Sequence, residues 1–330
     1  MKDVARLAKV SVGTVSRYLN GHRVTEQNRV RIERAIKELD FRVNPIAKTL
    51  RTNRSMTVAV LVPSLSNIFS MSIIENIERY LEPHGYSVIV CSCSNDPAKE
   101  REKLEFVKSK AVDGVIVMPV SDQGSHIEEV AAGELPVVLI DRLTSDFQTD
   151  AVVVDNTNAV YHAVEQLIIR GHRHIGLIAG PQSIYTARER LEGYRRVMAD
   201  YGLPIDPDLI VYGDYQAGTG HDLMKKLMTQ SRPPSAVLVS NYEMTIGAIT
   251  CLQELGTKIP EDLSVVGFDH LELSVVVNPP LAVVVQPREQ IGTQAAKLLY
   301  RRLSGDKNNY PTLVRLKTEF VEGRSIASII

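Results

Sequence analysis

The stretch SVGTVSRYLNG, from Ser11 to Gly21, combines residues suited to contact with a nucleic acid. Val12 can place methyl groups against a thymine, and Gly13 has no side chain, so the backbone can approach a base closely. Arg17 can pair with a guanine through two hydrogen bonds. A glycine costs a helix about 1 kcal/mol relative to alanine, which is understandable if the stretch lies against a partner outside the protein. Two further residues can reach phosphates: Thr14 and Ser16.

A second interpretation needs no nucleic acid. Val12 and Val15 could both lie in a core, with Arg17 exposed only to water. The helical period places Val15 on the inward face, so we assign it to the core. We keep Val12 and Arg17 as candidates for contact with DNA.

Three short helices are predicted to position this stretch. Ser11 is a suitable N-cap for a helix over 12–19, and Asn20-Gly21 ends it. Two other helices are expected, one before it and one after Thr25. Their apolar faces are predicted to contain Val4, Leu7 and Ala8 in the first and Val30, Ile32, Ile36 and Leu39 in the third. Short helices joined by a tight turn predict a helix-turn-helix module.

Charge is distributed unevenly along the chain. Residues 1–54 contain 13 Lys/Arg and 5 Asp/Glu, a balance of +8, whereas the remainder has 25 basic and 34 acidic residues, a balance of −9. A basic N-terminal segment on an acidic body favours a nucleic-acid partner for that segment. We expect no membrane span, no signal peptide and a cytoplasmic location. The 3 cysteines are expected to be small buried residues: Cys91, Cys93 and Cys251.

From Thr57 onward, short runs rich in valine, isoleucine and leucine alternate with segments of helical period. This alternation predicts an α/β fold with parallel sheets that are covered on both faces. About ten strands are many for one doubly wound sheet, so we expect two similar lobes with a cleft between them. Ligands of such folds bind beyond the carboxyl ends of the strands.

The chain resembles the lactose-repressor family of bacterial transcription regulators. The resemblance is carried by DVARLAKVSVGTVSRYLNG, RIERAIKELDFRVNPIAKTLR and TVAVLVPSLSNIF, and continues through DGVIVMP, PVVLIDR, GHRHIGLIAGP, ARERLEGYRRVMADYGL, SNYEMTIGA and SVVGFDHLEL. It implies an N-terminal all-α helix-turn-helix domain over 1–43, a hinge helix and linker over 44–56, and an effector-binding and dimerisation domain over 57–330. The last would have two doubly wound parallel-sheet lobes of periplasmic-binding-protein type. The N-lobe would span about 57–157 and 287–316, and the C-lobe about 158–286 and 317–330.

The resemblance also implies roles for individual residues. Val12, Gly13 and Arg17 match base-reading positions, and Leu50 matches a leucine that wedges into the minor groove. The remaining hinge residues expected at DNA are Asn44, Ala47, Lys48 and Arg51. The positions that match effector-binding residues in the cleft are Phe69, Asp141, Arg190, Asn241, Asp269 and Gln286. Carboxylate, amide and guanidinium groups together suit a polyol, because each can bind hydroxyls in pairs.

Two of these assignments have alternatives. Asp269 could be a turn residue, and Arg190 could form a surface salt bridge with Glu189 or Glu192. The chain also departs from the family pattern in several places. Lys9 replaces a frequent glycine at the tight turn, Ile68 stands where proline is common, and Tyr242 stands where an acidic residue is frequent.

These features predict a repressor that binds a pseudo-palindromic operator on double-stranded DNA as a homodimer. A small effector, a sugar or sugar derivative, would control it through population shift. The alternatives are control by a protein partner such as a phosphocarrier, and a solute-binding module without a DNA role. No nucleophile, metal or dinucleotide motif is evident, so we expect no enzyme activity, no metal and no cofactor.

Overall fold

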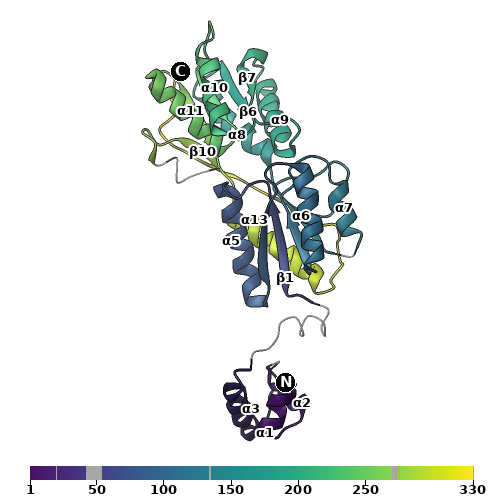
Figure 1. The fold of residues 1–330 in the computed structure, drawn as a ribbon. Coiled ribbons are helices and arrows are strands. Elements are labelled where there is room, and N and C mark those ends of the chain that lie inside the picture. The colour runs from purple at the N-terminus through teal and green to yellow at the C-terminus, as the bar shows by residue number, and fades with distance from the viewer. Residues whose placement is uncertain (20, 42–53, 134, 270–273, 275, 330) are drawn as a thin grey trace. The chain divides into compact units, whose positions relative to one another are not determined.

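The computed structural model describes residues 1–19, 21–41, 54–133, 135–269, 274 and 276–329. The chain divides into two compact units, Met1–Met56 and Thr57–Ile330, which are described separately (Figure 1).

The described part of the first unit consists of three helices, α1 (Lys2–Ala8), α2 (Val12–Leu19) and α3 (Glu26–Glu38). The bounds predicted for α2 are confirmed. Lys9 ends α1 in the left-handed conformation with φ of 54°, at the position where the family often has glycine. The core of this unit is made of six buried side chains: Val4, Ala5, Ala8, Val15, Ile32 and Ala35.

Three apolar side chains predicted for this core are exposed instead. Leu7 is 42% exposed, Val30 53% and Leu39 43%. Val30 lies about 160° around the helix from the buried Ile32, and Leu39 follows the last residue of α3. Ala5 is buried in α1 instead of Leu7, because the inward stripe of this helix is centred between Val4 and Ala5.

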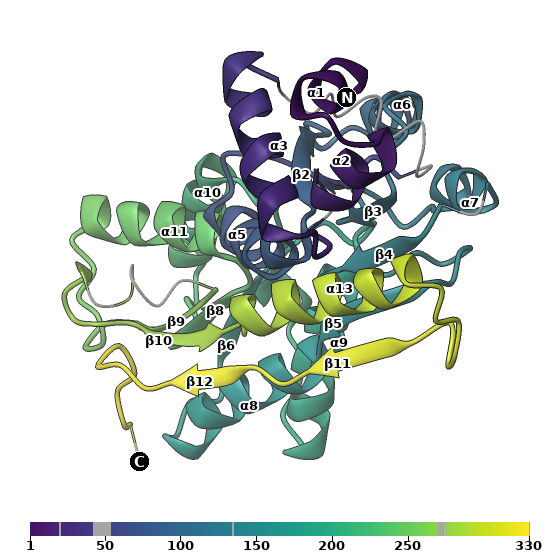
Figure 2. The ribbon, with the colours of Figure 1, turned by 90° about the horizontal axis from the view of Figure 1, so that it is seen from below.

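In the described part of the second unit, the strands form two six-stranded sheets (Figures 1 and 2). The first has the order β11-β5-β4-β3-β1-β2 and is parallel throughout. Its strands are β1 (Thr57–Val62), β2 (Ser87–Ser92), β3 (Gly114–Val117), β4 (Val137–Ile140), β5 (Asp150–Val154) and β11 (Leu313–Leu316).

The second sheet has the order β12-β10-β9-β8-β6-β7, and only its edge strand β12 is antiparallel to its neighbour. Its strands are β6 (Ile175–Ala179), β7 (Ile210–Tyr212), β8 (Ala236–Val239), β9 (Ser264–Phe268), β10 (Ala282–Val285) and β12 (Glu319–Val321). Two lobes of α/β type are therefore confirmed, with an antiparallel edge strand that we did not predict.

Helices cover both faces of each sheet. The first lobe has α5 (Ile68–Leu81) packed with α13 (Arg288–Leu303), and α6 (Pro97–Ser109) packed with α7 (Ser125–Ala131). The second lobe has α8 (Asn156–Ile169) with α9 (Tyr185–Asp200), and α10 (Ala217–Met228) with α11 (Tyr242–Leu255). Short 3-10 helices are η1 (Glu82–His84) and η2 (Pro207–Leu209).

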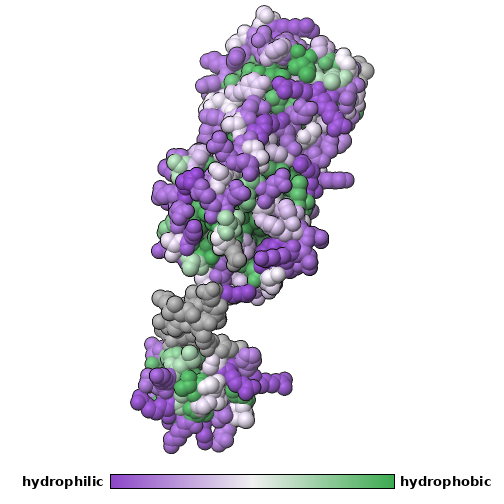
Figure 3. Space-filling model, turned by 90° about the vertical axis from the view of Figure 1, so that its right-hand side faces the viewer, coloured by the Kyte–Doolittle hydropathy of each residue, from purple (hydrophilic) through white to green (hydrophobic). Residues whose placement is uncertain are grey.

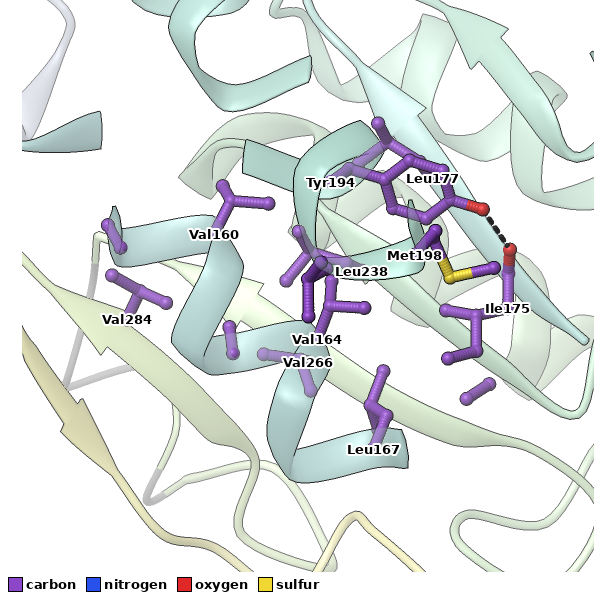
Figure 4. Close-up of a cluster of buried hydrophobic side chains, with 14 of the residues drawn as sticks. Val160, Val164, Leu167, Ile175, Leu177, Tyr194, Met198, Leu238, Val266 and Val284 are labelled. Carbon is purple, nitrogen blue, oxygen red and sulfur yellow. Dashed lines mark hydrogen bonds between the residues drawn. The ribbon is translucent and has the colours of Figure 1, made fainter. Parts of the chain in front are cut away.

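Each lobe has its own hydrophobic core. In the second lobe, α8 and α9 close over one face of the sheet, and the hydroxyl of the fully buried Tyr194 donates to the carbonyl of Ile175 at 2.8 Å (Figure 4). Gly193 permits this packing, since a Cβ there would collide with the carbonyl oxygen of Thr157 on α8. The three cysteines are buried and unoxidised, as predicted.

The chain passes between the lobes after β5, after β10 and between β11 and β12. Loops that follow the carboxyl ends of the parallel strands of both sheets therefore face one another. Residues in these loops form the candidate site of the second unit.

Candidate functional site

The first candidate site is the outer surface of α2. Val12 is 44% exposed, whereas Val15 is fully buried, so the alternative that both valines lie in the core is wrong. Gly13 and Arg17 are exposed, and Thr14 and Ser16 are partly buried. The hydroxyl of Ser11 accepts from the backbone N–H of Thr14 at 3.1 Å, as expected for an N-cap.

Helix α2 is fixed to α3 by a charged hydrogen-bond cluster. The hydroxyl of Tyr18 donates to Glu33 Oε1 at 2.9 Å, and Arg29 donates to the same oxygen at 2.9 Å. Arg29 is also held by Glu26. The hydrogen bond to Glu33 raises the pKa of Tyr18, and burial adds to the shift. These bonds connect α2 to α3 at the surface of the unit.

The predicted hinge residues lie outside the described residues. They are Asn44, Ala47, Lys48, Leu50 and Arg51.

The second candidate site is a cavity of about 490 Å³ between the lobes. This volume lies within the range of small-molecule binding sites. All six residues predicted for the cleft are on its wall: Phe69, Asp141, Arg190, Asn241, Asp269 and Gln286. Phe69 and Asp141 come from the first lobe, and the others come from the second lobe and its connection to α13.

Arg190 is fixed in the cavity wall and is 4% exposed. Its Nε donates to Asn156 Oδ1 at 2.8 Å, a terminal nitrogen donates to the carbonyl of Ser240 at 2.5 Å, and the guanidinium lies 3.9 Å from the centre of the Phe268 ring. The alternative of a surface salt bridge for Arg190 is therefore wrong, and Glu189 pairs with Arg315 instead. A buried, oriented guanidinium is suited to bind hydroxyl or carboxylate oxygens.

Asp269 and Gln286 form a buried pair, in which Gln286 Nε2 donates to Asp269 Oδ1. They follow the neighbouring strands β9 and β10, which brings their side chains together. Burial raises the pKa of Asp269, although Arg190 and the hydrogen bond from Gln286 oppose the shift. Asp269 has φ of 80°, as the alternative of a turn residue would require. Asp269 also lines the cavity, so it is more than a turn residue.

Asp141 is 4% exposed, with Oδ2 at 3.3 Å from Arg142 Nε. Burial raises the pKa of Asp141, and the charges of Arg142 and Arg190 reduce this effect. Asn241 caps α11 by accepting from Met244 N–H at 3.1 Å. Each of these groups follows a strand of a parallel sheet, where ligands of such folds bind.

Tyr215 also lines the cavity, and the sequence reasoning missed it. Its carbonyl accepts from Asn241 Nδ2 at 3.3 Å, and its ring lies so close to Gly180 that any Cβ there would overlap it. Tyr215 has φ of 67°, a left-handed value shared with Asp141 and Asp269. Such values in residues other than glycine cluster at functional sites. The signal in the sequence was YGDYQ, an aromatic residue just after a predicted strand.

Four polar atoms of residues on the cavity wall have no hydrogen-bond partner among the described residues. They are Asp141 Oδ1, Arg142 Nε, Gln286 Oε1 and the hydroxyl of Tyr215. Buried polar atoms in native proteins are normally paired, so these atoms are suited to bind a polar ligand.

Among the described residues, no group of three or more His, Cys, Asp and Glu side chains is arranged to hold a metal ion. In the segment GHRH, from Gly171 to His174, the ring of His172 forms hydrogen bonds with the hydroxyl of Ser235 and with the carbonyl of Ala327. None of the described helices has both the length and the apolar character that crossing a membrane requires.

Comparison with known protein families gives matches over both units. Residues 1–44 match the model of bacterial regulatory proteins of the lacI family, and residues 55–320 match that of periplasmic binding proteins and the sugar binding domain of the LacI family. The HTH-type transcriptional repressor CytR of Escherichia coli K12 is 34% identical over 311 residues, which cover 92% of this chain and 90% of that protein.

The solved structures similar to this chain include the lac repressor and a ribose-bound regulator. The lac repressor dimer bound to operator and an anti-inducer has a TM-score of 0.88 at 26% identity, and the match covers 98% of each chain. A LacI family regulator from Enterococcus faecium with bound ribose has a TM-score of 0.75 at 26% identity, with 83% of this chain and all of that chain covered. The chain therefore belongs to the lactose-repressor family, whose members bind DNA to repress transcription and respond to small-molecule effectors.

Proposed function

We propose that this repressor reads its operator with the exposed face of α2 and binds a neutral, hydroxyl-rich effector in the inter-lobe cavity. Val12, Gly13 and Arg17 would contact base edges, while two partly buried hydroxyls, those of Thr14 and Ser16, would bind phosphates. The lac repressor dimer on operator supports binding as a homodimer to an inverted repeat. A repressor of this kind would act in the cytoplasm, where the DNA is.

The hinge is part of this proposal. Leu50 would enter the minor groove as a wedge, with Asn44, Ala47, Lys48 and Arg51 around it. This assignment rests on the resemblance of FRVNPIAKTLR to the hinge segment of the family.

The observation that carries the effector proposal is the chemistry of the unpartnered atoms in the cavity. Asp141 Oδ1 and Gln286 Oε1 are acceptors, Arg142 Nε is a donor, and the Tyr215 hydroxyl can accept or donate. The guanidinium of Arg190 already donates to Asn156 and Ser240. A ligand with several hydroxyl groups, each able to donate and to accept, would satisfy these atoms, whereas one that presents only acceptors would leave Asp141 Oδ1 and Gln286 Oε1 unpaired.

The charges on the cavity wall favour an uncharged ligand over an anionic one. Four carboxylates line the cavity, and two guanidinium groups, those of Arg142 and Arg190, oppose them. The carboxylates are Asp141, Asp214, Glu243 and Asp269. A phosphorylated sugar would add negative charge to a wall that has no excess of cations. The similar E. faecium regulator, which has bound ribose, supports a neutral sugar.

The test is a thermal-shift titration of the full-length protein with matched ligands. D-ribose and related neutral sugars and nucleosides are compared with their phosphorylated counterparts at the same concentrations. A ligand at one hundred times its Kd stabilises the folded state by about 2.7 kcal/mol, which is easily measured. We expect a neutral ligand to raise the melting temperature. Stabilisation by the phosphorylated compounds alone would contradict the proposal.

A further inference from the structure

Three successive residues of α9 reach different parts of the second unit. Arg190 lies in the cavity wall, whereas Arg188 pairs with Asp122 and Glu189 pairs with Arg315. Successive side chains of a helix point about 100° apart, so the three groups leave α9 in separate directions. The helix that presents Arg190 to the cavity is thus bonded to the first lobe on two sides.

The first bond joins α9 to the loop after β3. Arg188 lies 2.8 Å from Asp122 Oδ1, and the two side chains are 40% and 31% exposed. The loop around Asp122 is itself fixed: Ser145 donates to the carbonyl of Asp122 through its N–H at 2.8 Å and its hydroxyl at 3.1 Å. The N–H of Val120 in the same loop donates to the fully buried Glu100 at 3.0 Å. Asp122 therefore offers α9 an anchored carboxylate.

The second bond joins α9 to β11, next to the point where the chain passes between the lobes. Arg315 lies 3.2 Å from Glu189 Oε2 and donates to the hydroxyl of Tyr185 at 3.1 Å. The carbonyl of Glu189 also accepts from the hydroxyl of Thr157 on α8. Because α9 is packed into the core of the second lobe, it moves with that lobe. One bond would leave the second lobe able to rotate about that contact relative to the first lobe, and two bonds in different directions restrict this rotation.

We infer that Asp122 and Arg315 are positioning residues for the cavity, although neither lines it. Through α9 they hold the second lobe in the orientation at which Arg190 faces the polar groups of the first lobe. The inference rests on the proposed role of the cavity as the effector site. It assigns to this site two residues of the first lobe that do not contact the effector and that affect its binding only by positioning α9.

The test measures the arrangement of the lobes directly and needs no effector. Spin labels are attached to cysteines at the exposed positions Glu105→Cys on α6 and Lys226→Cys on α10, and the distance distribution is measured in the full-length protein. Labelled protein is mixed with an excess of unlabelled chain, so that distances within one chain dominate. We expect Asp122→Asn combined with Arg315→Gln to add a second population. Each partly exposed ion pair should change the population ratio by about two- to fivefold.

Three comparisons make the test specific. Arg195→Gln removes an exposed cation from the same helix and should leave the distribution unchanged. Exchanging the charges with Asp122→Arg and Arg188→Asp should restore most of the first population. High salt should produce the second population in the otherwise unaltered protein, which tests the inference even if a variant folds poorly.

Identical distributions for the unaltered and neutralised proteins, at low and at high salt, would overturn the inference. The same variants are then titrated with D-ribose by calorimetry. We expect weaker binding in the neutralised variant and unchanged binding in Arg195→Gln. If D-ribose fails to bind the unaltered protein, the proposed effector class is wrong, whereas the distance distributions still decide the role of Asp122 and Arg315.

Discussion

At the scale of single residues, the contact between Tyr215 and Gly180 fixes one wall of the cavity. A Cβ at position 180 would overlap the phenol ring, so Gly180→Ala forces the ring to move. We expect this variant to lose about 1–3 kcal/mol of stability, the usual cost of overpacking. The measurement is urea unfolding, followed by titration with any ligand that the thermal-shift experiment identifies. Ligand affinity should fall as well, since Tyr215 lines the cavity.

A double-mutant cycle isolates this contact. In the background Tyr215→Ala the ring is absent, and Gly180→Ala should then be neutral or should stabilise by up to about 1 kcal/mol through the unfolded state. The same loss in both backgrounds would show that Gly180 is needed for another reason.

Asp269 provides a prediction about pH. Burial raises the pKa of Asp269 in the folded protein, so the folded state holds this proton more tightly than the unfolded state does. The stability contributed by the protonated form is complete below the ordinary aspartate pKa of about 3.9 and is lost as the pH rises through the folded pKa. The variant Asp269→Asn has no ionisable group at this position. The free energy of unfolding of the variant, relative to that of the unaltered protein, should therefore increase as the pH rises from 4 upward.

Urea unfolding of both proteins across this pH range is the measurement. The part of the difference in free energy of unfolding that is the same at every pH reflects the altered hydrogen bonds with Gln286 and with the backbone of Tyr242. A difference in stability that does not change with pH would show that the pKa of Asp269 is not raised in the folded state.

Five polar residues of the cavity were predicted through the family resemblance, but their partners were not, nor were the charged residues Arg142, Asp214 and Glu243 that also line it. Asp269 and Gln286 each follow a recognisable strand, yet their hydrogen bond depends on β9 and β10 being neighbours, which local pattern does not show. The bond from Arg190 to Asn156 likewise depends on the packing of α8 against α9. Tyr215 was missed because one aromatic residue in a loop has no periodicity by which to recognise it.

At the scale of elements, prediction succeeded where the end of an element has a chemical signal. The bounds of α2 followed from Ser11 and Gly21, and the valine-rich strands followed from composition. Strands β11 and β12 were missed, because LVRL and EFV have no buried residue and their pairing is set by distant segments. Leu7 was misplaced because the hydrophobic period does not show that Ala5 fills this small core, and Val30 was misplaced because it lies on the opposite face of α3 from Ile32.

Variants of helix α2 and of the loop that follows it can distinguish recognition of the DNA bases from binding to the DNA backbone. Arg17 is exposed on this helix, whereas Arg23 is exposed on the loop that follows it. We expect Arg17→Ala to weaken binding to an operator selected from random duplexes by about 1–3 kcal/mol and to change binding to unrelated DNA much less. Arg23→Ala should weaken both to a similar extent and reduce the salt dependence. Fluorescence anisotropy at several salt concentrations measures all four affinities.

An equal loss on both DNAs for Arg17→Ala would reassign this residue to a phosphate contact. Arg23→Ala is the matched control, because it removes the same charge from the same unit.

At the scale of the whole molecule, the balance of charge gives the two units different tasks. The segment 1–54 carries +8 and the remainder −9, so DNA attracts the first part of the chain and repels the rest. One helix-turn-helix contacts only a few base pairs, which limits both its affinity and its specificity. In the proposed homodimer, two copies held by their second units would gain affinity, because binding of the second head would become intramolecular.

This argument leads to a prediction about the operator. The full-length protein should bind an inverted repeat about 10²–10⁴-fold more tightly than a duplex in which one half-site is scrambled, the gain expected from linking two binding modules. Residues 57–330 alone should bind neither duplex. The ratio is measured by anisotropy at fixed salt, because salt alone changes protein–DNA affinity by orders of magnitude. Equal affinity for the whole and the half operator would mean that two heads do not act together, and the proposed dimeric repressor would have to be abandoned.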